Sequence, residues 1–211
     1  MSADLFEFSD ADFADLIQNA EEEKLAAKAY RTNTRKNIRR AKSEALLADI
    51  LPPFIDEGDS WHVLSCGDVD ALSFFSHIVK TTPMDYVLFS TWCMAMPDVR
   101  AFSDWLETGQ IKRLDAYVGE IFPNQYMDEH LALCEVVKPA GRCAVFRNHS
   151  KIFACRAGDR AWVIESSANI NTNPRTENTV ITADTGLFLH HKAYFDGVRS
   201  FNRDFDNWQP A

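Results

Sequence analysis

The sequence lacks several features that define whole classes of protein. No apolar run approaches the roughly 18 residues that a membrane helix needs, and the N-terminal segment is acidic where a signal or transit peptide would be basic. The cysteines are odd in number and form no Cys-x-x-Cys pair, which argues against a disulfide framework or a zinc knuckle. We therefore expect a cytoplasmic protein with buried free thiols and no membrane association.

Three common enzyme motifs are also missing. The chain has no Walker loop, no Gly-x-Ser-x-Gly elbow and no dinucleotide-binding fingerprint, which weighs against an NTPase, a serine hydrolase and a dehydrogenase. A net charge of −9 argues against a protein that wraps nucleic acid with a wholly basic surface. A local basic cleft is still compatible with this charge.

The amino-acid composition is typical of a soluble globular protein of one or two domains. Of the 211 residues, 46% are hydrophobic and 25% are charged. A chain of this length removes roughly 70% of its surface from water on folding, so it needs no disulfide or structural metal to form a core. We expect neither a metal nor a cofactor.

Basic residues gather near the N-terminus, where seven of them between Lys28 and Lys42 follow an acidic, helix-forming stretch. They either contact nucleic-acid phosphates or pair with the acidic helix. The residues that we assign to phosphate contact are Arg35, Lys36, Arg39 and Arg40. Pro52-Pro53 then predicts a boundary between a helical charged arm, residues 1–52, and a compact domain, residues 53–211.

Beyond that boundary, strand and helix patterns alternate. Strands are expected at 61–66, 86–90, 114–121, 143–155, 160–166 and 179–181, and helices at 69–79, 98–106, 127–137 and 187–198. Ala157-Gly158-Asp159 is a hairpin signal. The pattern predicts an α/β fold in which helices sandwich a mixed, largely parallel sheet.

Residues 147–178 carry the chemistry. On a strand, Arg147, His149 and Lys151 would project from one face. The hairpin would bring Ser167 and Asn169 to the same end of the sheet, and the segment around Glu177 would return beside them. An imidazole can attack phosphorus, an ammonium and an amide can hold the phosphoryl oxygens, and a carboxylate can orient the imidazole, all without a metal.

These residues resemble the His-x-Lys and Ser-x-Asn motif of the phospholipase D superfamily. His149 and Lys151 match the first part, Ser167-Ala168-Asn169 the second, and the strand that begins near Glu177 matches the segment that follows. The resemblance follows the order of elements from about residue 59 to residue 205. The motif's aspartate falls on Arg156, and its glycine falls on Ser166.

The resemblance implies a metal-independent phosphodiesterase that forms a phosphohistidine intermediate. Because we find one credible copy of a motif that the family uses twice, it implies a homodimer in which two copies of His149 and Lys151 meet. Catalysis is assigned to His149, Lys151, Asn169 and Glu177, and substrate binding to Ser167, Arg147 and the basic segment. We expect a nuclease acting on DNA or RNA. The alternative, motivated by Arg156 and Ser166, is a non-catalytic nucleic-acid-binding or scaffold protein on the same fold.

Three other groups of residues could bind a metal or repeat the motif, but each has a simpler structural explanation. Asp68 and Asp70 could hold Mg²⁺, although helix capping by Asp68 explains them more simply. Glu129, His130 and Cys134 share a helix face, but the sequence shows no further ligands for a metal. His190-His191-Lys192 repeats His-x-Lys without a neighbouring Ser-x-Asn, which favours a surface cluster on a helix.

Overall fold

The computed structural model describes residues 34–170 and 175–201. The chain divides into two compact units, residues 1–34 and residues 35–211. The helix predicted for the acidic N-terminal stretch lies outside the described residues.

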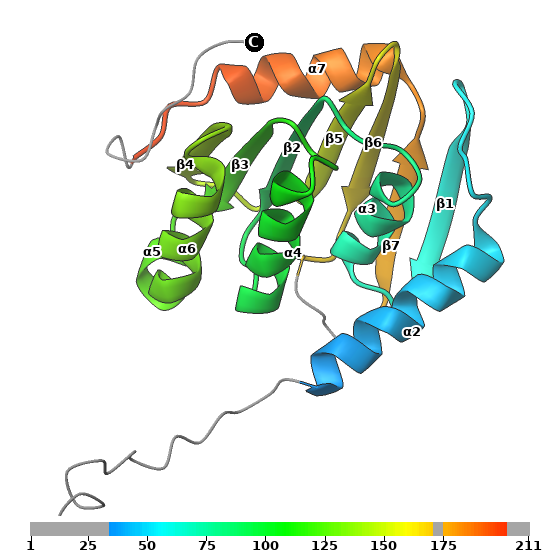
Figure 1. The fold of residues 1–211 in the computed structure, drawn as a ribbon, viewed down its shortest axis with the longest axis horizontal. Helices are drawn as coiled ribbons and strands as arrows, with labels where there is room; N and C mark the ends of the chain where they lie inside the picture. The colour runs from blue at the N-terminus through cyan, green and yellow to red at the C-terminus, as the bar shows by residue number, and fades with distance from the viewer. Residues whose placement is uncertain (1–33, 171–174, 202–211) are drawn as a thin grey trace, which may run out of the picture. The chain divides into compact units, whose positions relative to one another are not determined.

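Seven strands form one sheet, in the order β1-β7-β6-β5-β2-β3-β4 (Figure 1). The strands are β1 (Ser60–Ser65), β2 (Tyr86–Thr91), β3 (Leu114–Gly119), β4 (Gly141–Phe146), β5 (Ile152–Ala157), β6 (Arg160–Ser166) and β7 (Glu177–Thr182). The helices are α2 (Thr34–Ile50), α3 (Ala71–Val79), α4 (Met96–Glu107), α5 (Phe122–Gln125), α6 (Met127–Val137) and α7 (Thr185–Asp196). The α/β architecture is the predicted one.

The prediction of a largely parallel sheet is wrong. Only the β2–β3 and β3–β4 pairs are parallel, whereas β1–β7, β7–β6, β6–β5 and β5–β2 are antiparallel. The pairings nevertheless give β1, β2, β3, β4 and β6 one common direction. The chain inserts β5, β6 and β7 between β1 and β2, so β1 and β6 have no neighbour that runs in their own direction.

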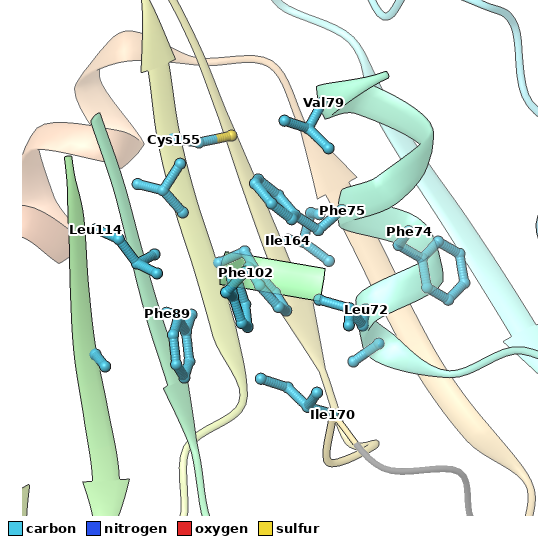
Figure 2. Close-up of a cluster of buried hydrophobic side chains, with 14 of the residues drawn as sticks. Leu72, Phe74, Phe75, Val79, Phe89, Phe102, Leu114, Cys155, Ile164 and Ile170 are labelled. Carbon is cyan, nitrogen blue, oxygen red and sulfur yellow. The ribbon is translucent and has the colours of Figure 1, made fainter. Parts of the chain in front are cut away.

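Helices cover both faces of the sheet. On one face, α3, α4 and α6 pack on the larger core, where the stacked rings of Phe75 and Phe153 lie 4.9 Å apart and those of Phe89 and Phe102 lie 4.7 Å apart (Figure 2). On the other face, Phe188 and Phe195 of α7 pack on a second cluster. Alternate residues of β2 serve the two cores, because successive side chains of a strand point to opposite faces.

The compact unit begins earlier than the sequence indicated. Leu47 and Leu51 are buried in the larger core, and Glu44 accepts a hydrogen bond from Ser76 of α3 at 2.8 Å. Residues 35–50 thus belong to the same unit as the sheet, whereas the expected boundary was at residue 52. No helix in the described ranges combines the length and the apolar character that crossing a membrane requires.

Two strand predictions need correction. Residues 143–155 form two strands, β4 and β5, separated by a non-strand segment at residues 147–151. The predicted buried strand at residues 61–66 is an edge strand whose side chains are mostly exposed, Leu64 at 77%. The predicted hairpin is confirmed, with Gly158 at φ 57°, a left-handed value that glycine adopts without strain.

Candidate active site

The predicted site residues meet at one edge of the sheet. The five strands that share a direction end there, and β5 and β7 begin there. The Ser166 amide donates to the Lys151 carbonyl at 2.9 Å, and the Ser167 amide donates to the Asn178 carbonyl at 2.9 Å. These bonds bring the ends of three strands together, as the hairpin prediction required.

The segment that carries His149 is anchored by Asn148, a buried residue that the sequence did not single out. Its amide nitrogen donates to Ser90 Oγ at 2.9 Å and to the Tyr117 carbonyl at 3.1 Å, and its Oδ1 accepts from the Ser150 amide at 3.0 Å. The segment is thereby tied to the ends of β2 and β3. Because it is not a strand, the predicted row of Arg147, His149 and Lys151 on one strand face does not form.

His149 and Lys151 are adjacent all the same. The Lys151 ammonium lies 3.1 Å from His149 Nδ1 and donates to the His149 carbonyl oxygen at 2.5 Å. His149 is exposed, and the ring of Trp92 lies beside it with centroids 5.5 Å apart. The imidazole is thus accessible on one side and braced on the other.

Lys151 is buried, with 8% of its surface exposed. Burial lowers the pKa of its ammonium, and the nearby Cys93 and Glu177 oppose that change. The cation is therefore held in place and poorly hydrated. Such a charge interacts more strongly with an incoming anion than an exposed lysine does.

Glu177 is also buried, and its carboxylate accepts a hydrogen bond from the Ser167 hydroxyl. That hydroxyl also accepts from the Asn178 amide at 3.0 Å. The structure therefore places Glu177 against Ser167, whereas the sequence predicted that it would orient His149. Glu177 influences the site through its electrostatic interaction with Lys151.

Asn169 lies just beyond β6, and its side-chain oxygen is buried without a hydrogen-bond partner among the described residues. Ser166 Oγ accepts from the Ala168 amide at 3.1 Å and shares a 2.8 Å hydrogen bond with Thr179. The side chain of Ser166, which replaces the motif's glycine, thus forms hydrogen bonds with its own loop and with β7. The Asn169 oxygen can therefore accept a hydrogen bond without breaking one that the described residues already make.

A cavity of about 380 Å³ opens beside the segment that carries His149. Arg147, His149, His190, His191 and Tyr194 contribute to its wall. The second His-x-Lys is therefore on a helix, as expected, and lies on the same cavity as His149. It does not duplicate the first site, because Lys192 pairs with Asp196 at 2.6 Å.

The predicted phosphate contacts divide into two groups. Arg35, Lys36 and Arg39 lie on α2. Arg40 forms ion pairs with Asp98 at 2.5 Å and with Asp70 at 3.5 Å. Arg40 therefore stabilises the contact of α2 with the N-terminal ends of α3 and α4.

The two aspartates that the sequence raised as possible magnesium ligands act as local caps. Asp70 caps α3 by accepting from the Ser73 amide at 2.7 Å, and Asp68 accepts from the Cys66 amide at 3.0 Å. The helix cap is thus Asp70, two residues later than the Asp68 that we expected. Arg156, at the motif's aspartate position, lies over the Phe188 ring of α7 at 5.9 Å.

The comparisons with known proteins agree with the fold. No family model and no curated protein matches the chain. Among solved structures, polyphosphate kinase from Porphyromonas gingivalis superposes with a TM-score of 0.51 and 13% identity, over 69% of this chain and 27% of the kinase. The chain thus spans about a quarter of that protein.

Two further structures are less similar. Phosphatidylserine synthase from Haemophilus influenzae Rd KW20 gives a TM-score of 0.46 and 16% identity, over 88% of this chain and 52% of the synthase. TrmBL2, an archaeal chromatin protein, gives 0.46 and 10%, over 88% and 65%. The match to the kinase supports the predicted phospholipase D-like fold, and it shows the fold alone.

Proposed function

We propose that the chain is a metal-independent phosphodiesterase that cleaves nucleic acid through a phosphohistidine intermediate. The observation that carries this proposal is the contact of an exposed imidazole with a buried ammonium, His149 with Lys151, at the strand ends. The imidazole supplies the nucleophile, and the ammonium supplies the charge that a phosphoryl group requires. Burial lowers the pKa of this ammonium, and Cys93 and then Glu177 favour its charged form.

In the resting site, Lys151 donates toward Nδ1, so the neutral His149 ring carries its proton on Nε2. A phosphate that enters beside His149 offers oxygens to the ammonium and competes with Nδ1 for it. Nδ1 then takes a proton from solvent while Nε2 gives one up. The Nε2 lone pair is thereby freed at the atom that points away from Lys151.

The reaction then proceeds in two displacements. Nε2 forms a bond to phosphorus as the P–O bond to the leaving alkoxide breaks, and a second imidazolium donates a proton to that alkoxide. The same imidazole, now neutral, removes a proton from water, which attacks phosphorus and releases His149. We assign the second imidazole to His149 of a second copy of the chain, so the active unit is a homodimer.

A nucleic acid fits this site better than a lipid does. The basic residues Arg35, Lys36 and Arg39 lie along α2, in the same compact unit as the site. A polyanion contacts several such charges at once, whereas a single phosphate does not. We therefore assign sequence-independent contact with the nucleic-acid backbone to this segment.

One observation favours a second function, the binding of nucleic acid without cleavage. Lys151 occupies His149 Nδ1, and Ser167 engages Glu177, so the groups that would activate the imidazole already have partners. A site that stays in this arrangement binds a phosphate through its cations and N–H donors, but its imidazole does not attack phosphorus.

Incubation of the pure protein with plasmid and with single-stranded DNA and RNA, all in EDTA, separates the two functions. The phosphodiesterase proposal expects cleavage in EDTA and its loss in His149→Ala, with tight binding retained. His62→Ala, on exposed strand β1, is the matched control. Cleavage that persists in His149→Ala contradicts the mechanism, and binding without cleavage by the wild type identifies the second function.

A further inference from the structure

A second cluster of reactive side chains lies between helix α6 and strand β4, apart from the groups used above. His130 and Cys134 are four residues apart on α6 and therefore face the sheet together. Cys143 comes from β4 beneath them. Their donor atoms all lie within 4.8 Å of one another.

The distances match those of a metal centre. Cys134 Sγ lies 3.7 Å from Nε2 and 3.8 Å from Nδ1 of His130. Around a tetrahedral Zn²⁺, with bonds of about 2.3 Å to sulfur and 2.0–2.1 Å to nitrogen, donors lie about 3.5–3.8 Å apart. The Cys143 sulfur lies within 4.8 Å of both other donors, so side-chain adjustments of about an ångström would bring all three to zinc-ligand spacing.

Burial and donor type restrict the ion. Exposed fractions are 3% for His130, 1% for Cys134 and 0% for Cys143. Two sulfurs and an imidazole exclude Mg²⁺ and Ca²⁺, which require oxygen ligands, and select a soft ion such as Zn²⁺ or Cu⁺. Two thiolates neutralise the charge of a divalent ion. A neutral metal centre costs less free energy to bury than a charged one.

We infer that His130, Cys134 and Cys143 bind a structural Zn²⁺ ion that joins α6 to β4. On binding, each thiol gives up its proton to solvent and becomes a sulfur ligand, the imidazole donates its lone pair, and a neutral ligand such as water completes the fourth position. The ion cross-links the outermost strand of the sheet to the helix that covers it. This inference does not depend on the proposed function.

The surroundings support this assignment. The Phe122 ring packs edge-on against His130 at 5.8 Å and 81°, which holds the imidazole in place. Cys155, which is equally buried, lies on β5, three places away from β4 in the sheet, and therefore serves as a control.

The test is the zinc content and zinc response of the full chain, purified under reducing conditions. We expect about one equivalent of zinc by mass spectrometry of the metal. Removal with a zinc chelator should lower the Tm by about 5–10 °C, and added Zn²⁺ should restore it. Co²⁺ in place of Zn²⁺ should give the intense near-ultraviolet absorption of thiolate-to-cobalt charge transfer.

Cys134→Ser and Cys143→Ser should each weaken zinc binding at least tenfold, whereas Cys155→Ser, the buried control, should not. Because a core serine can itself impair folding, the cobalt spectrum of the wild type provides an independent measure of the ligands. Wild type that neither retains zinc nor gains Tm from it overturns the inference. So do equal losses in Cys155→Ser, or a Cys134–Cys143 disulfide that forms in the presence of zinc.

Discussion

Lys151 holds His149 at two points, the ring nitrogen Nδ1 at 3.1 Å and the backbone carbonyl at 2.5 Å. An ammonium has no lone pair to offer, so Nδ1 can only accept from it, and the ring proton resides on Nε2. In this state Nε2 can donate to an oxyanion but cannot attack phosphorus. The nucleophile of the proposed reaction is therefore produced by the substrate.

The tautomer of His149 should change when an anion binds. Nitrogen NMR of ¹⁵N-histidine-labelled protein is expected to show the Nε2–H form in the free protein and a larger share of Nδ1–H with tungstate, a phosphate mimic. Lys151→Met should show a mixture of the two forms that tungstate does not alter. A free protein already in the Nδ1–H form would contradict the geometry.

Lys151 should also make stability depend on pH. Burial lowers its pKa in the folded state below the ordinary value of 10.5, so the folded chain binds this proton less tightly than the unfolded chain does. Its contribution to stability therefore increases as the pH rises from the folded pKa toward 10.5. In urea unfolding, wild type should gain stability relative to Lys151→Met between pH 7 and pH 10. A constant difference would refute the assigned shift.

Removal of the Asn148 side chain should disorder the active-site segment without touching the nucleophile. Asn148→Ala leaves the Tyr117 carbonyl and the Ser150 amide without their buried partner, which costs about 2–3 kcal/mol of unfolding free energy. Cleavage should fall at least tenfold. Asn124→Ala, on the exposed surface of α5, is the control and should change neither.

The source of the second imidazole can be tested with mixed dimers. If His149 of each copy completes the other's site, a purified heterodimer of wild type and His149→Ala should have no activity, and His190→Ala should retain it. If His190, on the same cavity as His149, is the proton donor, the heterodimer should keep about half of the activity. Sedimentation of an active preparation as a 24.0 kDa monomer would also exclude the dimeric site.

The N-terminal truncation that preserves the fold should end before α2. Deletion of residues 1–33 is expected to leave the unfolding transition intact, whereas deletion of residues 1–50 removes the buried Leu47 and the Arg40–Asp98 pair. Loss of Leu47 alone costs about 2–5 kcal/mol. Equal thermal stability of the two truncations would show that α2 is not part of the compact unit.

The phosphate contacts of α2 are tested by the salt dependence of DNA binding. Substitution of Arg35, Lys36 and Arg39 by alanine should reduce the slope of log K against log salt by about 2–3 units if each contacts one duplex phosphate. Arg40→Ala should lower stability and leave the slope unchanged, because its guanidinium is paired with Asp98 and Asp70. A smaller slope in Arg40→Ala, with no change in the triple variant, would contradict this assignment.

Much of the architecture was readable from local patterns. Residues 160–166 and 127–137 form the predicted strand and helix without a shift, and the Gly158 turn joins β5 to β6. The order of neighbours in the sheet was not readable. Alternating strands and helices indicate a common direction, but they do not show that a later hairpin is inserted between β1 and β2.

The site was predicted as a set of residues and not as a geometry. Periodicity treated residues 143–155 as one strand because Asn148 and Ser150 resemble the outward polar residues of a half-exposed strand. Their side chains turn inward instead, toward the carbonyl of Tyr117 and the hydroxyl of Ser90. The positions of Cys93 and Trp92 depend on the meeting of β2 with β5, which local sequence does not encode.

The anchoring of the His149 segment determines which positions can vary over evolutionary time. Asn148 donates to the backbone carbonyls of Thr91 and Tyr117, and every amino acid supplies a carbonyl. Replacement of either side chain therefore leaves an acceptor where the amide needs one. The side chains at 91 and 117 can therefore change, whereas position 148 and Ser90, whose hydroxyl also accepts from the amide, are constrained, and a new binding surface can develop around His149 without displacing it.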